Sequence, residues 1–349
     1  MANITVGIAG SGHMGRAVAW AMDKLGYSLV ILDQQQHCLY KCQELLPERP
    51  HRFIRAKSFK CFNNCDMVIS SLPFHQNLSL ARFCIANNIA YCDLGGNVQT
   101  SQSINHFGKQ QSRNIIMTDL GLAPGWVNII AEHMYQKYIS KHNTTPTDIQ
   151  MRVGGLPQHP QNTLKYGCTW SYDGLVNEYR DRCKVLRHGE QIMVNGMQGY
   201  EYPIYSDIGP LEGFYTSGGV SHTIDTMQRR GVLNCSYKTL RYPQHHQIVN
   251  FLIHESGLDD KSIIDIFKKT CPPQDDLVII QVRVNDSSFE QVIRSDSQFS
   301  AMQKATGFPI ASAAHTILIS DVETDVLKYS DLNYPQFNKT LEQLFNIAN

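Results

Sequence analysis

The chain has 349 residues, of which 31 are lysine or arginine and 31 are aspartate or glutamate. Because the charges balance, we do not expect a protein that binds nucleic acid or an anionic membrane through a strongly basic surface. The apolar runs are shorter than the roughly 20 residues that a membrane span needs, and a strand is predicted too near the N-terminus to leave room for a signal peptide. We therefore expect a cytoplasmic protein with no nucleic-acid or membrane partner. We also expect two domains, because single cores stop growing beyond ~250–300 residues.

The first predicted elements carry a glycine motif. An apolar run over residues 4–9 leads directly into Gly10-Ser11-Gly12-His13-Met14-Gly15, and a helical pattern follows. In a strand–turn–helix unit the first glycine permits a tight turn, the second lets the backbone approach a pyrophosphate, and the third lets the helix pack on the strand. The start of the helix offers free N–H groups to the phosphates. The predicted dinucleotide site therefore contains Gly10, Gly12, His13, Met14 and Gly15; the alternative is a glycine-rich structural turn.

Asp33 ends the next apolar run, over residues 29–32. At this position a carboxylate accepts hydrogen bonds from the ribose hydroxyls of the cofactor, and its charge repels the 2′-phosphate of NADP. The next residues are Gln34, Gln35 and Gln36, with no nearby arginine to receive that phosphate. NAD is therefore expected rather than NADP, although an aspartate that only caps a helix is compatible with both.

Strands and helices continue to alternate up to residue 124, which predicts an α/β domain with a doubly wound parallel sheet of the Rossmann type. Further strands are expected at 67–70, 89–93 and 115–117, with a helix at 77–87. Ligands of such sheets bind beyond the carboxyl ends of the strands. The residues expected there, as further cofactor contacts, are Ser71, Leu72, Pro73, Gly95 and Asp119.

A change in pattern predicts a second, mixed α+β domain. A helix opens at Pro124 and Gly125, and β-like runs then occur at 149–153, 185–194 and 277–284, with helices at 245–256 and 260–269. Pro309 is expected at the first position of a helix that returns to the nucleotide domain. The expected division is 1–124 with 307–349, and 125–306 for substrate binding and dimerisation; a homodimer is expected.

Ten cysteines are present, several of them within apolar runs. In a chain of this size they indicate buried thiols in a reducing compartment. Cys38 with Cys42, and Cys61 with Cys65, have a spacing that metal ligands can have. A zinc site needs about four ligands, and no second pair accompanies these, so no metal site is expected.

Four blocks of sequence resemble the saccharopine dehydrogenase-like family, and most of all its lysine 6-dehydrogenase branch. They are Asp119–Gly125, the segment from Val153-Gly154-Gly155-Leu156-Pro157 through Tyr166 to Trp170–Leu175, Phe214–Gly219, and Tyr237–Tyr242. The resemblance implies an amino-acid substrate, a nicotinamide cofactor and oxidative deamination of the lysine ε-amine to a semialdehyde.

The resemblance and the chemistry together suggest roles for residues of these blocks. Arg241 is the candidate for a bidentate carboxylate clamp, against the alternative of a structural ion pair. The other expected substrate contacts are Gly155, Thr216 and Ser217. Oxidising an amine also requires a base to take its proton, and the candidates are Asp119, Tyr172 and His245, none of which sequence singles out.

Two departures from the family pattern lie in expected substrate loops. The chain has Pro243-Gln244-His245 where the family tends to place a glycine before the histidine, and Val220-Ser221-His222 where small hydroxyl residues are expected. They leave open a saccharopine-type dehydrogenase, which would need a second cationic clamp such as Arg152 or Arg180. A catalytically silent NAD-binding sensor or scaffold also stays open.

Overall fold

The computed structural model describes residues 4–47, 49–320 and 326–348. The chain divides into two compact units, the first made of Met1–Trp126 and Gln303–Asn349 and the second of Val127–Met302. The sequence suggested divisions after residues 124 and 306. Among the described residues, no helix is long and apolar enough to cross a membrane.

The first unit is built on a parallel six-stranded sheet with the order β3-β2-β1-β4-β5-β6. Its strands are β1 (Thr5–Ala9), β2 (Ser28–Asp33), β3 (Arg52–Arg55), β4 (Met67–Ser70), β5 (Ala90–Asp93) and β6 (Ile116–Met117). The helices between them are α1 (His13–Lys24), α2 (Gln36–Glu44), α3 (Phe74–Ala86) and α4 (Val98–Gln111). The strand order reverses beside β1, which is the doubly wound Rossmann arrangement and confirms the predicted fold class.

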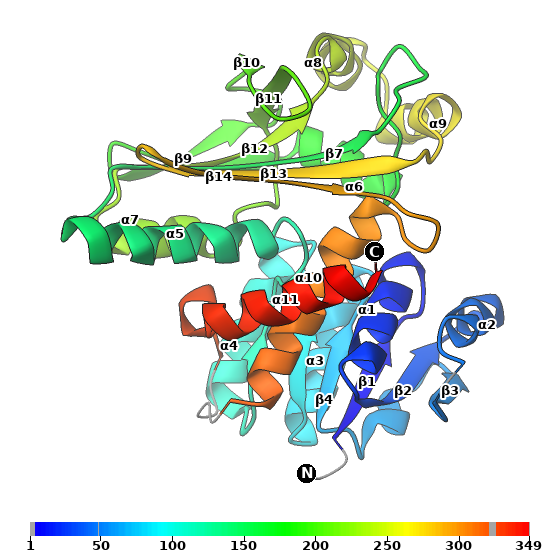
Figure 1. Ribbon diagram of the computed structural model, residues 1–349. Helices are drawn as coiled ribbons and strands as arrows, with labels where there is room; N and C mark the ends of the chain where they lie inside the picture. The colour runs from blue at the N-terminus through cyan, green and yellow to red at the C-terminus, as the bar shows by residue number, and fades with distance from the viewer. Residues whose placement is uncertain (1–3, 48, 321–325, 349) are drawn as a thin grey trace. The chain divides into compact units, whose positions relative to one another are not determined.

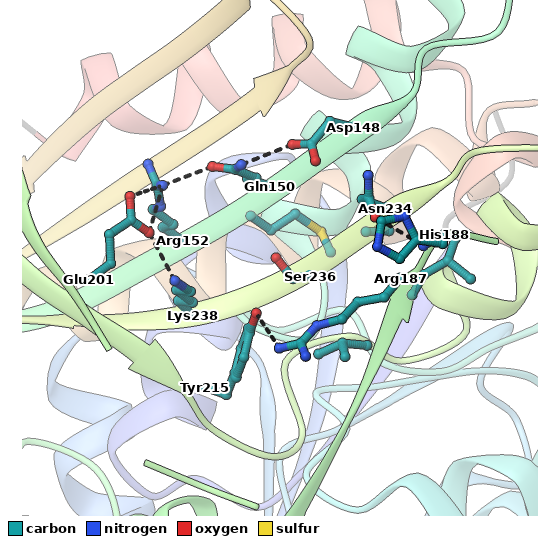
Figure 2. A pocket seen from close by; sticks show the side chains of 14 residues that line it. Asp148, Gln150, Arg152, Arg187, His188, Glu201, Tyr215, Asn234, Ser236 and Lys238 are labelled. Carbon is teal, nitrogen blue, oxygen red and sulfur yellow. Dashed lines mark hydrogen bonds and ion pairs between the residues drawn. The ribbon is translucent and has the colours of Figure 1, made fainter. Parts of the chain in front are cut away.

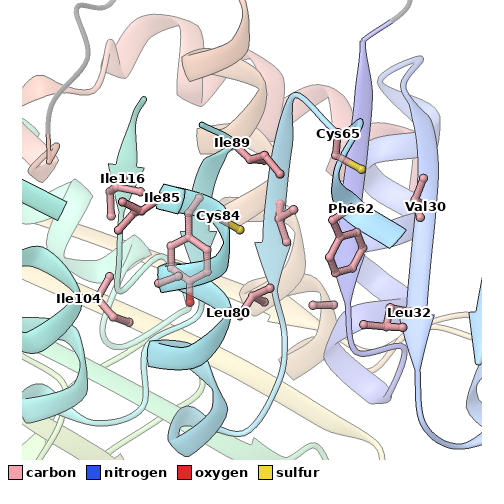
Figure 3. Packing of buried hydrophobic residues seen from close by; sticks show 14 of the residues in the cluster. Val30, Leu32, Phe62, Cys65, Leu80, Cys84, Ile85, Ile89, Ile104 and Ile116 are labelled. Carbon is pink, nitrogen blue, oxygen red and sulfur yellow. The ribbon is translucent and has the colours of Figure 1, made fainter. Parts of the chain in front are cut away.

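A buried cluster fills one side of this sheet. Phe62, in the 3-10 turn Phe59–Phe62, is fully buried in it with Leu32 and Leu80 (Figure 3). A methyl group added at Gly7 of β1 would lie 2.6 Å from the Phe62 ring. The glycine therefore lets the ring lie directly on the central strand.

The prediction that Pro309 starts a helix is wrong. Pro309 lies inside α10 (Ala301–Leu318). The helix begins earlier because the Asp276 carboxylate accepts hydrogen bonds from the backbone N–H groups of Ala301 and Met302, at 2.6 and 3.0 Å. This cap comes from a residue distant in sequence, so the local pattern could not show it.

The helix α11 (Tyr334–Ala348) and α10 from Gln303 onward belong to the first unit. Trp20 of α1 stacks on Phe308 of α10 with their ring centroids 5.4 Å apart. A methyl group at Gly307 would lie 2.8 Å from the Cβ of Ala17, so the glycine leaves room for α10 to lie close to α1.

The second unit contains an eight-stranded mixed sheet, which confirms the predicted α+β class. Its strands are β7 (Asp148–Pro157), β8 (Arg182–Arg187), β9 (Glu190–Asn195), β10 (Glu201–Ile204), β11 (Leu211–Tyr215), β12 (Asn234–Arg241), β13 (Asp276–Val284) and β14 (Ser287–Arg294). Its helices are α5 (Trp126–His142), α6 (Tyr172–Arg180), α7 (Thr223–Arg229), α8 (His245–Asn250), which continues as a π-helical turn over Phe251–Glu255, and α9 (Asp260–Thr270).

Alternation along β12 separates two faces of this sheet. Tyr237, Thr239 and Arg241 point to one face, while Ser236 and Lys238 point to the other. In Figure 1, α5 and α7 run along one face of the sheet. The site residues described below can therefore be assigned to one face or the other.

Replacing Phe62 by alanine should lower the free energy of unfolding by about 4 kcal/mol, because the ring is fully buried and its loss leaves a cavity under β1. Phe74→Ala is the matched control, since Phe74 is 39% exposed in the same unit. Urea denaturation followed by circular dichroism would measure both variants. Equal losses in the two variants would contradict the packing described here.

Candidate active site

The glycine motif forms a tight turn after β1. Gly10 has φ +91°, a conformation that favours glycine, and a methyl group at Gly15 would lie 1.9 Å from the Gly10 carbonyl oxygen. Ser71 supports the turn, because its hydroxyl donates to that same oxygen at 2.7 Å. A methyl group at Gly12 would instead meet no atom within 4 Å, so this side of the turn is open.

The open side of the turn is the N-terminus of α1. Gly12 is the N-cap residue and no side chain caps the helix there. The first N–H groups of a helix have no partner within it, so those near His13 and Met14 are available to an anion. This geometry fits the pyrophosphate of a dinucleotide.

Asp33 stands at the carboxyl end of β2 and is tied to the turn. One carboxylate oxygen accepts from the N–H and the hydroxyl of Ser11, at 2.7 and 3.0 Å, and the other accepts from the N–H of Gln35 at 2.8 Å. Arg55 is the neighbour of Asp33 on β3, and its Nε donates to the Gln34 carbonyl at 3.2 Å. An arginine therefore does lie near Asp33, contrary to expectation, because Arg55 comes from the next strand. The negative charge of Asp33 still disfavours a 2′-phosphate.

A buried pair of carboxyl groups lies where β5 and β6 end. Asp93 accepts from the N–H groups of Gly95 and Asp119, at 2.8 and 3.0 Å, and from the hydroxyl of Tyr91 at 2.9 Å. Burial, and then the charge of Asp119, raise the pKa of Asp93 to about 7. Asp119 has φ +64° and accepts from the hydroxyl of Ser101 at 2.7 Å.

Two of the other predicted cofactor contacts, Leu72 and Pro73, follow the end of β4. The N–H of Leu72 donates to the hydroxyl of Ser70 at 3.4 Å, and Pro73 is the N-cap residue of α3. Among the described residues, no group of three or more His, Cys, Asp or Glu side chains is placed to hold a metal ion.

Arg241, in the second unit, is a buried cation held by aromatic side chains. It is 3% exposed, its Nε donates to the hydroxyl of Tyr179 at 2.9 Å, and its Nη1 donates to the Leu240 carbonyl at 2.9 Å. The guanidinium carbon lies 4.6 Å from the ring centroid of Tyr166 and 5.7 Å from that of Tyr179. Stacking of this kind suits the planar guanidinium and keeps its fork in one orientation.

His245 completes this arrangement as a neutral side chain. Its Nδ1 lies 2.8 Å from the Leu164 carbonyl and its Nε2 lies 3.1 Å from the Tyr179 hydroxyl. Burial, and then the charge of Arg241, lower the pKa of His245 to about 3. The imidazole therefore donates to Leu164 and accepts from Tyr179, whose oxygen accepts from Arg241.

The remaining predicted residues of this unit lie in different settings. Thr216 shares a buried 2.7 Å hydrogen bond with Thr239, on the same face of β12 as Arg241, and the N–H of Ser217 donates to the Glu178 carbonyl at 3.0 Å. The Tyr172 hydroxyl donates to the Cys271 carbonyl at 3.1 Å instead. A methyl group at Gly155 would lie 2.7 Å from the Met302 side chain.

Sequence reasoning missed Glu178 and Tyr179 of α6. Glu178 is half-buried, and its carboxylate forms no hydrogen bond or ion pair with any residue that the structure describes. Burial raises its pKa to about 8, against the opposing charge of Arg241. Both residues come one helical turn after the family block Trp170–Leu175, and this position was the only sign in the sequence that they could lie near the site.

Arg152 and Arg180, the two candidates for a second cationic clamp, do not lie beside Arg241. Arg152 and Lys238 line the same hollow (Figure 2), whose volume is about 250 Å³. Arg152 is paired with Lys238 across β7 and β12, so both lie on the face of the sheet opposite Arg241. Both bind Glu201: Arg152 Nη2 lies 2.8 Å from Oε1, and Lys238 Nζ lies 2.9 Å from Oε2. Arg180 forms an exposed ion pair with Asp260 at 2.7 Å. Within the second unit, neither Arg152 nor Arg180 supplies a second clamp beside Arg241.

Comparison with known proteins assigns the chain to a family. Residues 121–344 match the family described as the saccharopine dehydrogenase C-terminal domain. The chain belongs to the saccharopine dehydrogenase-like family of oxidoreductases. The mitochondrial alpha-aminoadipic semialdehyde synthase of Rattus norvegicus is 22% identical to it over 354 aligned residues, which cover 74% of this chain and 37% of the relative. The chain thus spans little more than a third of that relative's length.

Two solved structures share the fold of this chain. Saccharopine dehydrogenase (L-Glu forming) from Saccharomyces cerevisiae superposes with a TM-score of 0.74 at 15% identity, covering 99% of this chain and 97% of that one. Homospermidine synthase from Legionella pneumophila, in complex with NAD, superposes with a TM-score of 0.69 at 10% identity, covering 98% and 89%. At these identities the likeness concerns the fold alone.

Both departures from the family pattern include a residue in a left-handed conformation. Gln244 has φ +84° and Ser221 has φ +46°. At Gln244 the family tends to place glycine, which adopts this conformation without a steric cost. The Glu212 carboxylate holds the turn here, because it accepts hydrogen bonds from the N–H groups of Gln244 and His246.

Gln244→Gly should raise the free energy of unfolding by about 1 kcal/mol, because it removes the steric cost of the left-handed conformation. Gln247→Gly, one turn on and also exposed but within α8, should lower it by about 1 kcal/mol, because glycine weakens helix interiors. Thermal unfolding of the two variants would measure both shifts. A loss of stability in Gln244→Gly as large as that in Gln247→Gly would contradict the assignment of strain to this position.

Proposed function

We propose that this protein is an NAD-dependent dehydrogenase that oxidises the ε-amine of L-lysine, or of a close analogue, to the semialdehyde. The observation that carries the proposal is the buried Arg241, whose guanidinium is oriented by Tyr179 and Tyr166. A charged donor fork fixed in a dry environment is suited to binding a substrate carboxylate through two parallel hydrogen bonds. Family membership supports a lysine-related amino acid as the substrate.

The first unit supports the nicotinamide cofactor. The open turn at Gly12, the uncapped start of α1 and the carboxylate of Asp33 would hold the pyrophosphate and the adenosine ribose. The homospermidine synthase with the same fold was solved with NAD. Bound in this site, NAD supplies the acceptor for the hydride that leaves the carbon bearing the amine. The negative charge of Asp33 favours NAD over NADP. Arg55 beside it is a cation that suits the 2′-phosphate of NADP, so it reduces this preference.

The proposed reaction also needs an acceptor for a proton. The amine loses one proton and its carbon loses a hydride, which gives an imine; water then adds to the imine and ammonia leaves. Of the three sequence candidates for the base, His245 and Tyr172 bind neighbouring groups through their polar atoms. Asp119 fits the role best, because a carboxylate that accepts one hydrogen bond from Ser101 keeps further acceptor positions for a proton.

A saccharopine-type dehydrogenase is the second candidate function. The name of the yeast enzyme with the same fold favours it, and saccharopine carries a second dicarboxylic arm. In the second unit, however, Arg152 is bound to Glu201 on the other face of the sheet and Arg180 is exposed. Lysine itself therefore fits the described residues better.

Incubating the purified protein with NAD or NADP and a panel of amino acids, and following the absorbance of the reduced cofactor, tests the proposal. We expect turnover with NAD and L-lysine and little with L-saccharopine. Turnover with saccharopine alone would overturn the proposal in favour of the second candidate. Cofactor binding without turnover of any amine would instead indicate a silent sensor or scaffold.

Gly12→Ala tests the predicted cofactor site in the same assay. Its added methyl group meets no atom of the protein within 4 Å, so the variant should fold as the wild type does. The methyl group would lie where the pyrophosphate approaches the backbone, and turnover should be lost.

A further inference from the structure

The hollow around Arg152 and Lys238 takes no part in the proposed oxidation. Strands β7, β8, β10, β11 and β12 of the second unit all contribute to its lining. In Figure 2 the hydroxyl of Ser236 lies in the middle of the labelled side chains. With a volume of about 250 Å³, the hollow is slightly smaller than the sites of drug-sized molecules, which are about 300–1,000 Å³. Its size therefore suits a small molecule or ion.

A series of contacts holds three cationic side chains at this hollow. Arg187 Nη2 donates to the Tyr215 hydroxyl at 3.4 Å, and Lys238 Nζ lies 5.2 Å from the centroid of the same ring. On its other side Lys238 Nζ lies 2.9 Å from Glu201 Oε2, and Arg152 Nη2 lies 2.8 Å from Glu201 Oε1. One tyrosine and one glutamate thus fix the positions of all three cations.

The hollow carries more positive than negative charge. Its cations are Arg152, Arg187 and Lys238, and its carboxylates are Glu201 and Asp148. The side chains of Arg152 and Lys238 are only 14% exposed, and Glu201 is the one carboxylate among the described residues that binds them. Charged groups so far from water are normally matched by opposite charges. Since two such cations share a single carboxylate, one positive charge is left for a ligand to match.

The same two cations also keep hydrogen-bond donors for a ligand. Arg152 Nε is buried and has no hydrogen-bond partner in the part of the chain that the structure describes. Lys238 Nζ carries three N–H groups, of which Glu201 accepts one at 2.9 Å. A buried donor without an acceptor is costly, so a ligand that supplies acceptor oxygens is stabilised here.

We propose that the hollow is a second ligand site, which binds a small phosphate-type oxyanion. The source of this group is inorganic phosphate or a small phosphorylated molecule. A tetrahedral oxyanion directs its oxygens to several sides, so it suits donors that come from different strands. Arg152 of β7 and Arg187 of β8 supply guanidinium groups, and β12 supplies the ammonium of Lys238 and the hydroxyl of Ser236.

Isothermal titration calorimetry of the full chain with inorganic phosphate tests this site. Lys238→Gln removes a charged donor from the hollow and should weaken phosphate binding by roughly tenfold or more. Lys184→Gln is the matched control, because Lys184 also forms an ion pair at a partly buried position, with Asp225 at 3.0 Å, and is not part of the lining. This control should bind phosphate as the wild type does.

Two substitutions of Ser236 guard against a loss of fold. Ser236→Ala removes only a hydroxyl group and should weaken phosphate binding by about threefold or more. Ser236→Asp places a carboxylate in the hollow and should abolish binding. Added phosphate should raise the melting temperature of the wild type and of Lys184→Gln, but not that of Ser236→Asp. Phosphate bound at the glycine turn of the first unit would respond to none of these substitutions.

Glycerol 3-phosphate and succinate identify the class of ligand. Tighter binding of glycerol 3-phosphate than of phosphate would support the site with a phosphorylated molecule as its ligand, and equal binding would support it with inorganic phosphate. Tighter binding of succinate than of either would overturn the phosphate class. The site itself is overturned if phosphate does not bind, or if the wild type and Lys238→Gln bind it equally. These outcomes do not depend on the oxidation of lysine, so they stand apart from the proposed function.

Discussion

The burial of one guanidinium group determines how the second unit is organised. Removing Arg241 from water costs several kcal/mol unless its charge and its donors are compensated. Tyr179, the Leu240 carbonyl and the ring of Tyr166 supply that compensation, and His245 supports Tyr179 as a neutral acceptor. Helices α6 and α8 are therefore bound to the end of β12 by polar contacts as well as by packing. A protein gains little stability from such an arrangement, so its use in binding a ligand is the more economical explanation.

Much of the fold could be predicted because both units follow strong periodic patterns. The alternation of short apolar runs with helical patterns indicated a parallel sheet, and the later β-rich runs indicated a mixed second sheet. What could not be predicted depended on distant residues. The start of α10 is set by Asp276, and β3 is a short edge strand whose residues are no more than partly buried, so it has little hydrophobic signal.

The candidate site shows the same division between local and distant information. The roles expected for Gly10, Gly12 and Gly15 follow from backbone geometry, so a linear motif was enough to suggest them. Arg55 lies beside Asp33 through strand pairing, and Tyr179 of α6 reaches Arg241 through a hydrogen bond, neither of which appears in a linear pattern. The resemblance to the family located Arg241, while physical contacts were needed to see what surrounds it.

Arg241 is proposed to recognise the carboxylate of an amino-acid substrate. A comparison of kcat/KM for L-lysine and for cadaverine, which lacks the carboxylate, in the wild type and in Arg241→Met tests this recognition. We expect the wild type to prefer lysine by roughly a hundredfold, as the loss of a buried charged contact implies, and the preference to disappear in the variant. An equal preference for lysine in both proteins would contradict it.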